Sequence, residues 1–374
     1  MKIFLVGDLI LDEPNPDLLF DDAREILKTA DVLVGHVEVP HTNRGKDSHF
    51  DIPAPPANPE HLEALKNAGF HGVTLAGNHF FDAGKEGVED TINKLHSLRI
   101  KTTGAGMNLN EARKPAIFEK KGLKIGFLSY NCVGPRESWA NEKKAGVAYI
   151  RVITHYELNN ANPGGKPEVF TFAEPVLLEK MQSDIENLKK EVDFVVVAFH
   201  KGLVHTPIEI AMYERQIAKA AIEAGADAIV GHHAHILKGI EFYKGKPIFH
   251  GLGNFATVTK ALNVEENASP ERLEWAKKRT KLFGFERIPD YPNYPFHPES
   301  RNTMIASIEF SKNGIEKVGF IPCWIVANGS PKPLKVSDTQ GKETIQYIEK
   351  ITKKAGFKTS FLVDEEKNIV SVQQ

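Results

Sequence analysis

Three histidines stand close together in Gly231-His232-His233-Ala234-His235, directly after an apolar run at 226–230. As cations on a buried strand they would repel one another, and as neutral rings they would add little to packing. Neutral imidazole is, however, a good ligand for Zn, Mn and Fe. This segment therefore predicts metal binding.

Other residues of metal-ligand type also follow apolar runs. Taken alone, such an Asp or Glu is more often a turn or helix-cap residue, and a Gly-Asn pair also describes an ordinary turn. In layered α/β folds, however, the carboxyl ends of neighbouring strands form the crevice in which ligands bind. The combined set contains no thiolate and suits one or two divalent cations such as Mn, Zn or Fe. Its further members are Asp8, Glu38, Asn78, His79 and His200.

The elements that must position these residues are strands alternating with helices, which predicts an α/β fold. Helix signals are clear in two places. Thr206-Pro207-Ile208-Glu209 combines an N-cap, a first-turn proline and a capping-box glutamate, and Gly225 would end that helix. Asn58-Pro59 opens another helix that ends near Gly69. Strand-like runs lie at 2–7, 31–37, 71–76, 123–130, 192–199, 226–230, 246–251, 303–310 and 315–321, and a helix and strand are expected at 342–372.

Two regions interrupt this alternation. Residues 131–175 contain the loop-forming run 159–165, and residues 284–302 are rich in proline and aromatic residues. Long insertions in compact domains are usually functional or mobile. The 284–302 segment is therefore either a proline-stiffened surface crossing or a lid over a substrate.

The composition describes a folded protein with a large core. Hydrophobic residues make up 41% of the 374 residues, and 47 Lys and Arg against 49 Asp and Glu give no electrostatic basis for binding nucleic acid. Cys132 and Cys323 are far apart in sequence, so we expect no disulfide framework.

No stretch approaches the roughly 18 to 20 apolar residues of a membrane span. The first strand-like run reaches Asp8 too soon for a signal peptide. We expect a cytoplasmic protein, and its oligomeric state stays open.

Longer strings of residues carry a resemblance to a family. AGNHFFDAG at 76–84, HKG at 200–202 and GHHAHILKGIEFYKGKPIFHGLGNF at 231–255 are the most specific. Together with Asp8 and Glu38, they resemble the calcineurin-like metallophosphoesterases, and more closely their CapA-like branch, named for poly-γ-glutamate capsule synthesis. The resemblance implies a sandwich of two mixed β-sheets flanked by helices over 1–325, with insertions at about 131–175 and 256–302. Residues 326–374 would be a C-terminal helix-strand extension.

The resemblance also implies roles for residues. Glu38 stands where a carboxylate bridges two metals in the family, and Asp8 where a terminal ligand lies. His79 beside Asp82 resembles the proton-transfer residue, and a His oriented by a carboxylate three residues on is a plausible general acid. The implied metal ligands are Asp8, Glu38, Asn78, His200, His232 and His235.

Two positions depart from the family pattern. Ile10 stands where the parent phosphoesterases have a His ligand, so one metal site has lost a ligand and the chain binds either one or two ions. His36 stands where the CapA-like pattern usually has Asn. It is an extra ligand, a base, or a histidine packed in a strand.

The sequence thus favours a cytoplasmic, divalent-metal-dependent hydrolase. Its substrate would be a small molecule or peptide, either a phosphoester or a glutamate-like or peptide amide. One alternative is a peptide Cα epimerase of the same fold, with His36 and His79 as bases on the two faces of Cα. Another is a non-catalytic scaffold that the metal stabilises. Capsule-building members usually carry a membrane anchor, which we do not expect here. Four cations near these motifs either line the pocket or are solvated at its rim, and for most surface Lys and Arg the rim is the expectation; they are Arg136, Lys201, Lys238 and Arg301.

Overall fold

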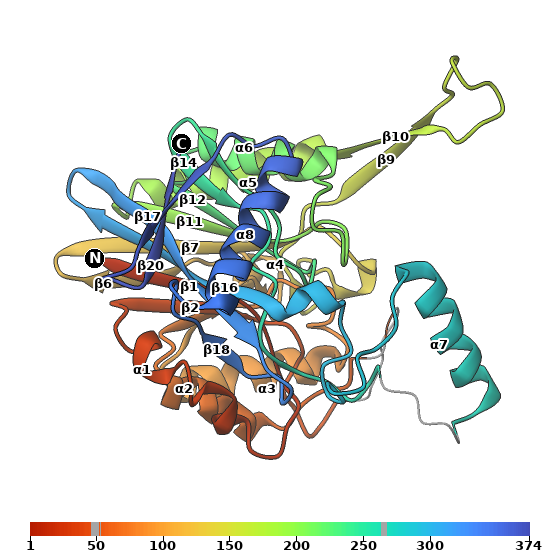
Figure 1. Ribbon diagram of the computed structural model, residues 1–374, viewed down its shortest axis with the longest axis horizontal. Coiled ribbons are helices and arrows are strands. Elements are labelled where there is room, and N and C mark those ends of the chain that lie inside the picture. Colours follow the sequence, from red (N-terminus) through yellow and green to blue (C-terminus); the bar gives the residue numbers. More distant parts are fainter. Residues whose placement is uncertain (46–51, 53, 263–267) are drawn as a thin grey trace.

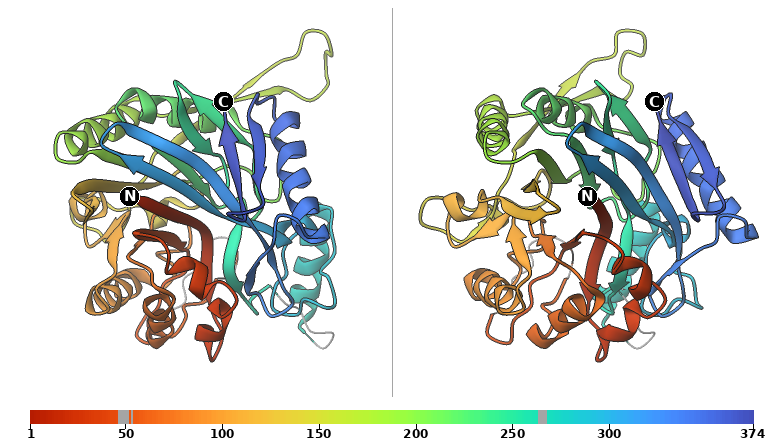
Figure 2. Two further views of the ribbon diagram at one scale, coloured as in Figure 1. Left: turned by 60° about the vertical axis from the view of Figure 1, so that its left-hand side comes forward. Right: turned by 90° about the vertical axis from the view of Figure 1, so that its left-hand side faces the viewer.

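The computed structural model describes residues 1–45, 52, 54–262 and 268–374. In these residues two large mixed β-sheets, of ten and six strands, pack face to face with helices on their outer sides (Figures 1 and 2). The predicted α/β sandwich of two mixed sheets flanked by helices is confirmed.

The larger sheet has the order β19-β20-β17-β16-β1-β2-β3-β4, with β15 beside β1 and β18 beside β17. β1 pairs in parallel with β2 and β15 and antiparallel with β16. The strands are β1 (Lys2–Leu11), β2 (Val32–Val37), β3 (Gly72–Thr74), β4 (Lys101–Thr103), β15 (Asn254–Val258), β16 (Asn302–Ser311), β17 (Gly314–Ile325), β18 (Pro331–Pro333), β19 (Ser360–Asp364) and β20 (Ile369–Gln373).

The smaller sheet has the order β13-β14-β12-β11-β7-β6, and its four central strands run in parallel. Its strands are β6 (Ala116–Lys120), β7 (Leu123–Asn131), β11 (Phe194–His200), β12 (Ala228–His232), β13 (Ile240–Tyr243) and β14 (Lys246–Phe249). Two small sheets pair β5 (Ala105–Gly106) with β8 (Gly146–Val147) and β9 (Val152–Glu157) with β10 (Glu168–Ala173).

Side chains point alternately to the two faces of each sheet, so the large sheets and their helices enclose three large hydrophobic clusters: one between the sheets and one on the outer side of each. In β1, Ile3 and Leu5 face the smaller sheet, whereas Phe4 and Val6 face the helices on the other side. The helices α2 and α3 cover the larger sheet at β2 and β3, α5 and α6 cover the smaller sheet, and α8 packs on β16 and β17. The helices are α1 (Arg24–Leu27), α2 (Glu63–Ala68), α3 (Gly84–Ser97), α4 (Leu109–Ala112), α5 (Pro175–Lys189), α6 (Met212–Glu223), α7 (Pro270–Phe283) and α8 (Thr339–Lys354), and short 3-10 turns span Pro16–Phe20, Pro59–Leu62, Arg136–Ser138 and Pro298–Arg301.

One helix start was predicted wrongly. The helix expected from Thr206 begins instead at Met212, after Ala211, whose backbone N–H donates to Glu214 Oε1 across 2.9 Å. Thr206 uses its hydroxyl to bond the carbonyl of Val204 in a loop. The local signal was overridden because Glu214 both caps α6 and pairs with a buried lysine. The helix expected from Asn58 is confirmed: the Asn58 side chain accepts from Glu60 N at the start of a 3-10 turn that continues into α2, and Gly69 ends it.

The two interrupting regions contain structure of their own. Residues 131–175 include the hairpin β9–β10, which projects from the body (Figure 1). The helix α7 lies within the insertion expected at about 256–302 and precedes the segment 284–302. The segment expected as an extension adds β20 to β17 of the larger sheet and buries Ile345 and Ile348 of α8. The domain boundary at 325 stays a prediction.

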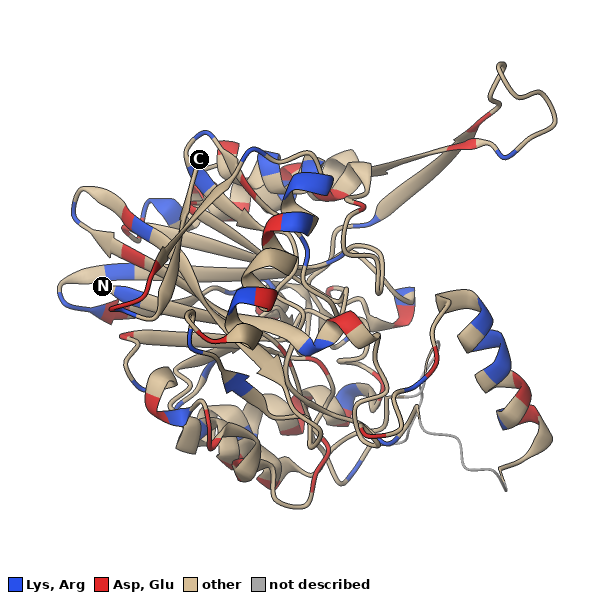
Figure 3. Cartoon of the chain, viewed as in Figure 1, with Lys and Arg blue, Asp and Glu red and all other residues tan. Residues whose placement is uncertain are grey.

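The remaining global expectations concern charge, cysteines and the membrane. Acidic and basic residues are interspersed along the elements (Figure 3). Cys132 and Cys323 are free and buried, and burial raises the pKa of both thiols. Among the helices described, none has the length and apolar character that crossing a membrane requires.

Candidate metal centre

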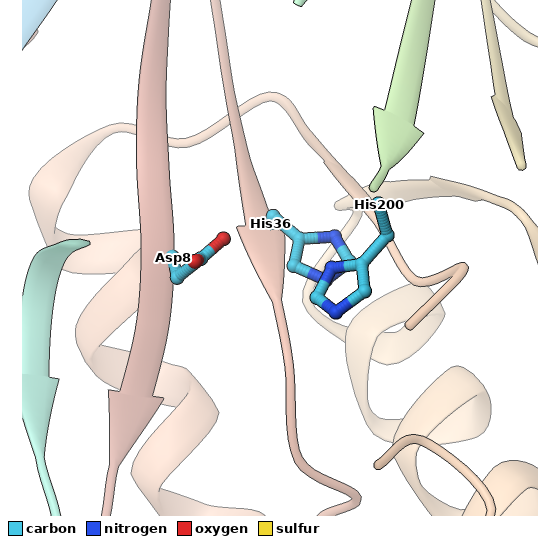
Figure 4. A group of neighbouring side chains, drawn as sticks. All are labelled: Asp8, His36 and His200. Carbon is cyan, nitrogen blue, oxygen red and sulfur yellow. The ribbon is translucent and has the colours of Figure 1, made fainter. Parts of the chain in front are cut away.

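The predicted site residues meet where the carboxyl ends of strands from both sheets face each other. Asp8 and His36 are cross-strand neighbours on β1 and β2, and His200 and His232 are neighbours on β11 and β12. The ring of His36 lies 4.7 Å from those of His200 and His232, measured between centroids. Figure 4 shows Asp8 turned toward His36, with His200 reaching the same place from the other sheet. Strand 2–7 extends to Leu11, so Asp8 lies within β1 and not after its end.

One group of ligand atoms consists of Asp8, Glu38 and His235, with one atom of each within 4.8 Å of the others. His235 Nδ1 lies 3.5 Å from Asp8 Oδ2, and its Nε2 lies 3.3 Å from Glu38 Oε1. His235 Nδ1 also donates to Asn254 Oδ1 across 2.8 Å. Both carboxylates are almost completely buried.

A second group shares Asp8 and adds His36 and His200, again within 4.8 Å. His36 Nδ1 bonds Thr74 Oγ1 (3.0 Å), and His200 Nε2 donates to Asn78 Oδ1 (2.8 Å). These bonds leave one nitrogen of each ring, His36 Nε2 and His200 Nδ1, buried and without a hydrogen-bond partner among the described residues. His232 Nδ1 lies 3.1 Å from Asp8 Oδ1 and completes the cluster.

Burial keeps four histidines of the cluster neutral, all except His235. Burial lowers the pKa of His36 to about 4 and those of His232 and His233 to about 3, and it lowers the pKa of His200 as well. A neutral imidazole has a lone pair available for a metal. The rings therefore have the protonation state that a ligand needs.

A carboxylate must be ionised to bind a metal, and the pKa values of Asp8 and Glu38 are shifted in opposite directions. Burial raises the pKa of Asp8 to about 7, and the charge of Glu38 adds to this rise. Burial would also raise the pKa of Glu38, but His235 outweighs it and lowers that pKa to about 2. Burial would lower the pKa of His235, yet Glu38 and Asp8 raise it to about 9. Asp8 and His235 thus hold protons more tightly than usual because two carboxylates are buried together, while Glu38 stays ionised beside His235.

A divalent cation fits these residues on two observations. Buried polar atoms without a partner are costly, and here several belong to metal-ligand types: His36 Nε2, Glu38 Oε2, His200 Nδ1 and His233 Nδ1. The donor set of imidazole and carboxylate without thiolate suits Zn, Mn or Fe. His233 (φ 83°) and His235 (φ 52°) are both held in the left-handed region, which few non-glycine residues adopt.

The predicted proton-transfer pair lies beside this cluster. His79 Nδ1 donates to Asp82 Oδ2 across 2.8 Å, in the turn before α3. Asp82 is buried and the His79 side chain keeps 12% of its surface exposed. A cavity of about 180 Å³ is lined by His79, Glu38 and His235 together, so the pair and one ligand group open onto the same space.

Sequence reasoning selected the cluster well but missed two of its neighbours. His233, named within the histidine run but not among the implied ligands, also lines the cavity. Asn254, which accepts from His235, belongs to the quoted string at 231–255. His205, another lining residue with φ 55°, follows the HKG string without a signal of its own.

Two further expectations were tested by burial. Lys201 and Lys238, expected as solvated cations at the rim, are completely buried, which contradicts that prediction. Arg136 is exposed as expected.

Ile10, which stands where the family pattern has a His ligand, lines the cavity. Of the 284–302 segment, Phe296 lines the cavity and Tyr294 accepts from Asn254 Nδ2, so this segment forms a wall of the site.

Comparisons with known proteins agree with the resemblance. The chain is similar to the PGA biosynthesis protein CapA of Bacillus subtilis (29% identical, 67% of this chain and 61% of the relative). It is also similar to the capsule biosynthesis protein CapA of Bacillus anthracis (27%, 68% and 59%). The chain thus spans about three fifths of the length of these relatives. Among solved structures, the calcineurin-like phosphoesterase YfkN of Bacillus subtilis aligns with a TM-score of 0.39 at 13% identity, covering 95% of this chain and 98% of that one. A family model described as bacterial capsule synthesis protein PGA_cap matches residues 2–259, which include every predicted metal ligand. The chain therefore belongs to the PGA_cap family of bacterial capsule synthesis proteins.

Proposed function

We propose that this protein is a divalent-metal-dependent hydrolase of a phosphoester or of a glutamate-like or peptide amide. The observation that carries the proposal is that His79, bonded to Asp82, opens onto the same cavity as Glu38 and His235. Asp8, Glu38 and His235 would hold one ion, and Asp8, His36 and His200 would hold another, with Asn78 bonded to His200 and His232 beside Asp8. When bound, such a cation polarises a phosphoryl or carbonyl oxygen and lowers the pKa of water.

The chain's own residues supply proton transfer. Asp82 accepts from His79 Nδ1 and so fixes the tautomer and the orientation of the ring. The other nitrogen, Nε2, is then the atom that exchanges a proton with a leaving group. Because Asp82 is buried, its charge also favours the protonated ring that acts as an acid.

The placement of His36 favours hydrolysis over Cα epimerisation. An epimerase needs a second base that reaches the substrate from the face opposite His79. His36 is completely buried, bonds Thr74 and stacks on His232, which supports a ligand role. One proton-transfer residue at the cavity is sufficient for a hydrolase.

The test is incubation of the metal-supplemented protein in deuterated water with phosphoesters and with glutamyl and peptide amides. Hydrolysis yields products whose combined mass exceeds that of the substrate by water. His79→Ala should lower turnover by about a hundredfold or more and leave the metal content unchanged, and His155→Ala, an exposed histidine on β9, serves as the control. Deuterium incorporation with inversion and without cleavage would favour the epimerase and overturn the proposal.

A further inference from the structure

The cavity has a second wall, formed by α7 and the segment after it. Arg279 of α7 and Phe283, its last residue, lie there with Phe296. The Arg279 guanidinium donates from Nη2 to the carbonyl of Pro295 across 2.7 Å, and lies 5.8 Å from the ring centroid of Phe283. Arg279 and α7 lie beyond the residues 2–259 that the family model matches.

Arg279 has no acidic partner in the described part of the chain. Other partly buried arginines do: Arg24 pairs with Asp17 and Arg113 with Asp184. Burial lowers the pKa of Arg279, and the neighbouring cation Arg272 lowers it further. A partly buried cation in such surroundings is costly unless an anion offsets it.

The wall is continuous with the metal centre through His205. The His205 ring lies 5.2 Å from that of Phe283 and 6.2 Å from that of His235, one of the proposed ligands. Phe296 contacts His235 directly, with centroids 4.9 Å apart. A molecule of modest size in this cavity can therefore meet both Arg279 and the metal groups.

We infer that Arg279 binds a carboxylate of the substrate, whose apolar portion lies against Phe283 and Phe296 while its reacting group lies at the metal centre. The inference rests on the proposed function and names the substrate class, an apolar molecule that carries a carboxylate. The planar guanidinium matches a carboxylate in a two-bond geometry. One arginine neutralises one negative charge, whereas a phosphate dianion would leave a charge unpaired among aromatic rings.

Ligand binding to the whole 374-residue chain tests this without requiring turnover. Hydrocinnamate, its uncharged amide and phenyl phosphate are titrated by calorimetry, with and without added Mn. The variants are Arg279→Gln, Arg279→Lys and, as a control for net charge, Lys278→Gln on the exposed face of α7. Thermal melts establish that each variant is folded.

The wild type should bind hydrocinnamate at least about tenfold more tightly than the amide. Arg279→Gln should lose this preference, Arg279→Lys should keep part of it, and Lys278→Gln should keep all of it. In the titrations without Mn, equal binding of acid and amide, no binding of hydrocinnamate, tighter binding of phenyl phosphate than of hydrocinnamate, or an unchanged preference in Arg279→Gln would each overturn the inference.

Failure of the two proposals is distinguishable. If the carboxylate preference depends on Arg279 but no phosphoester or amide is cleaved, the binding site stands and the hydrolase does not. If cleavage occurs and Arg279→Gln leaves both KM and the carboxylate preference unchanged, the hydrolase stands and the role of Arg279 is wrong.

Discussion

Lys201 donates a hydrogen bond to Glu214 across 2.7 Å, and neither side chain has exposed surface. Lys238 Nζ lies 3.4 Å from the other carboxylate oxygen, so one buried acid serves two buried lysines. Lys201 directly follows His200, a proposed ligand, and also donates to the carbonyl of His250. This group ties the residue after β11 to α6 and to the segment after β14.

Removing the shared acid should destabilise the protein strongly. Glu214→Gln leaves two buried ammonium groups without a counter-charge, and breaking a buried pair in this way costs about 3 to 5 kcal/mol. Urea denaturation measures the loss. Glu223→Gln, at the exposed end of the same helix, removes a surface pair with Lys244 and should change stability little. Equal effects of the two variants would contradict a structural role for the buried group.

The same group predicts a pH dependence of stability. Burial lowers the pKa of Lys238 to about 8 in the folded protein, whereas a lysine exposed to water in the unfolded chain has a pKa of 10.5. Between these values the unfolded chain holds the proton that the folded chain has released, so the stability from this group rises with pH. The rise amounts to roughly 3 kcal/mol and begins as pH passes about 8.

Lys238→Met tests this sign. The variant leaves Lys201 and Glu214 as a neutral pair, so its free energy of unfolding should lack the rise. Subtracting the pH profile of the variant from that of the wild type removes the titration of all other groups. A difference that is flat or falls between pH 8 and 10.5 would contradict the assignment.

Nine strands could be predicted from sequence because each contains an apolar run, whereas short strands such as β4 and exposed strands such as β9 lack one and were not predicted. The ligands were located at or near the ends of these runs, and their roles came from the family resemblance. Contacts between distant residues could not. His36 and His232 come from separate sheets and stack only because the sandwich brings them together. Glu214 was not recognised as a helix cap because its role depends on Lys201, and both lysines were placed at the surface because their buried acid is invisible in local sequence.

Metal removal should destabilise the folded protein. Chelation leaves Asp8 and Glu38 buried side by side, so the midpoint of thermal unfolding should fall and should recover with added Mn or Zn. His200→Ala removes a ligand and should lower both the metal content and this recovery. His155→Ala, on the exposed hairpin, should retain both. If elemental analysis finds no transition metal and the melts do not respond to Mn or Zn, the metal centre is wrong.

Ile10→His should raise the metal content per chain, because it places an imidazole at the position where the phosphoesterases that the sequence resembles have one. Ile10 lines the cavity two residues after Asp8 and packs against Val39 and Ala57. A neutral imidazole in this apolar contact costs about 1 to 3 kcal/mol, so without metal the variant should be less stable than the wild type. Added Mn should close this gap, since binding to the folded state alone stabilises it. Ile10→Leu keeps the size of the side chain without a ligand atom and controls for altered packing. Elemental analysis after equilibration with limiting Mn gives the ratio of ions to chains, and melts at several Mn concentrations give the stabilisation. Equal ratios in the His and Leu variants, with no extra stabilisation by Mn, would show that position 10 does not face an ion.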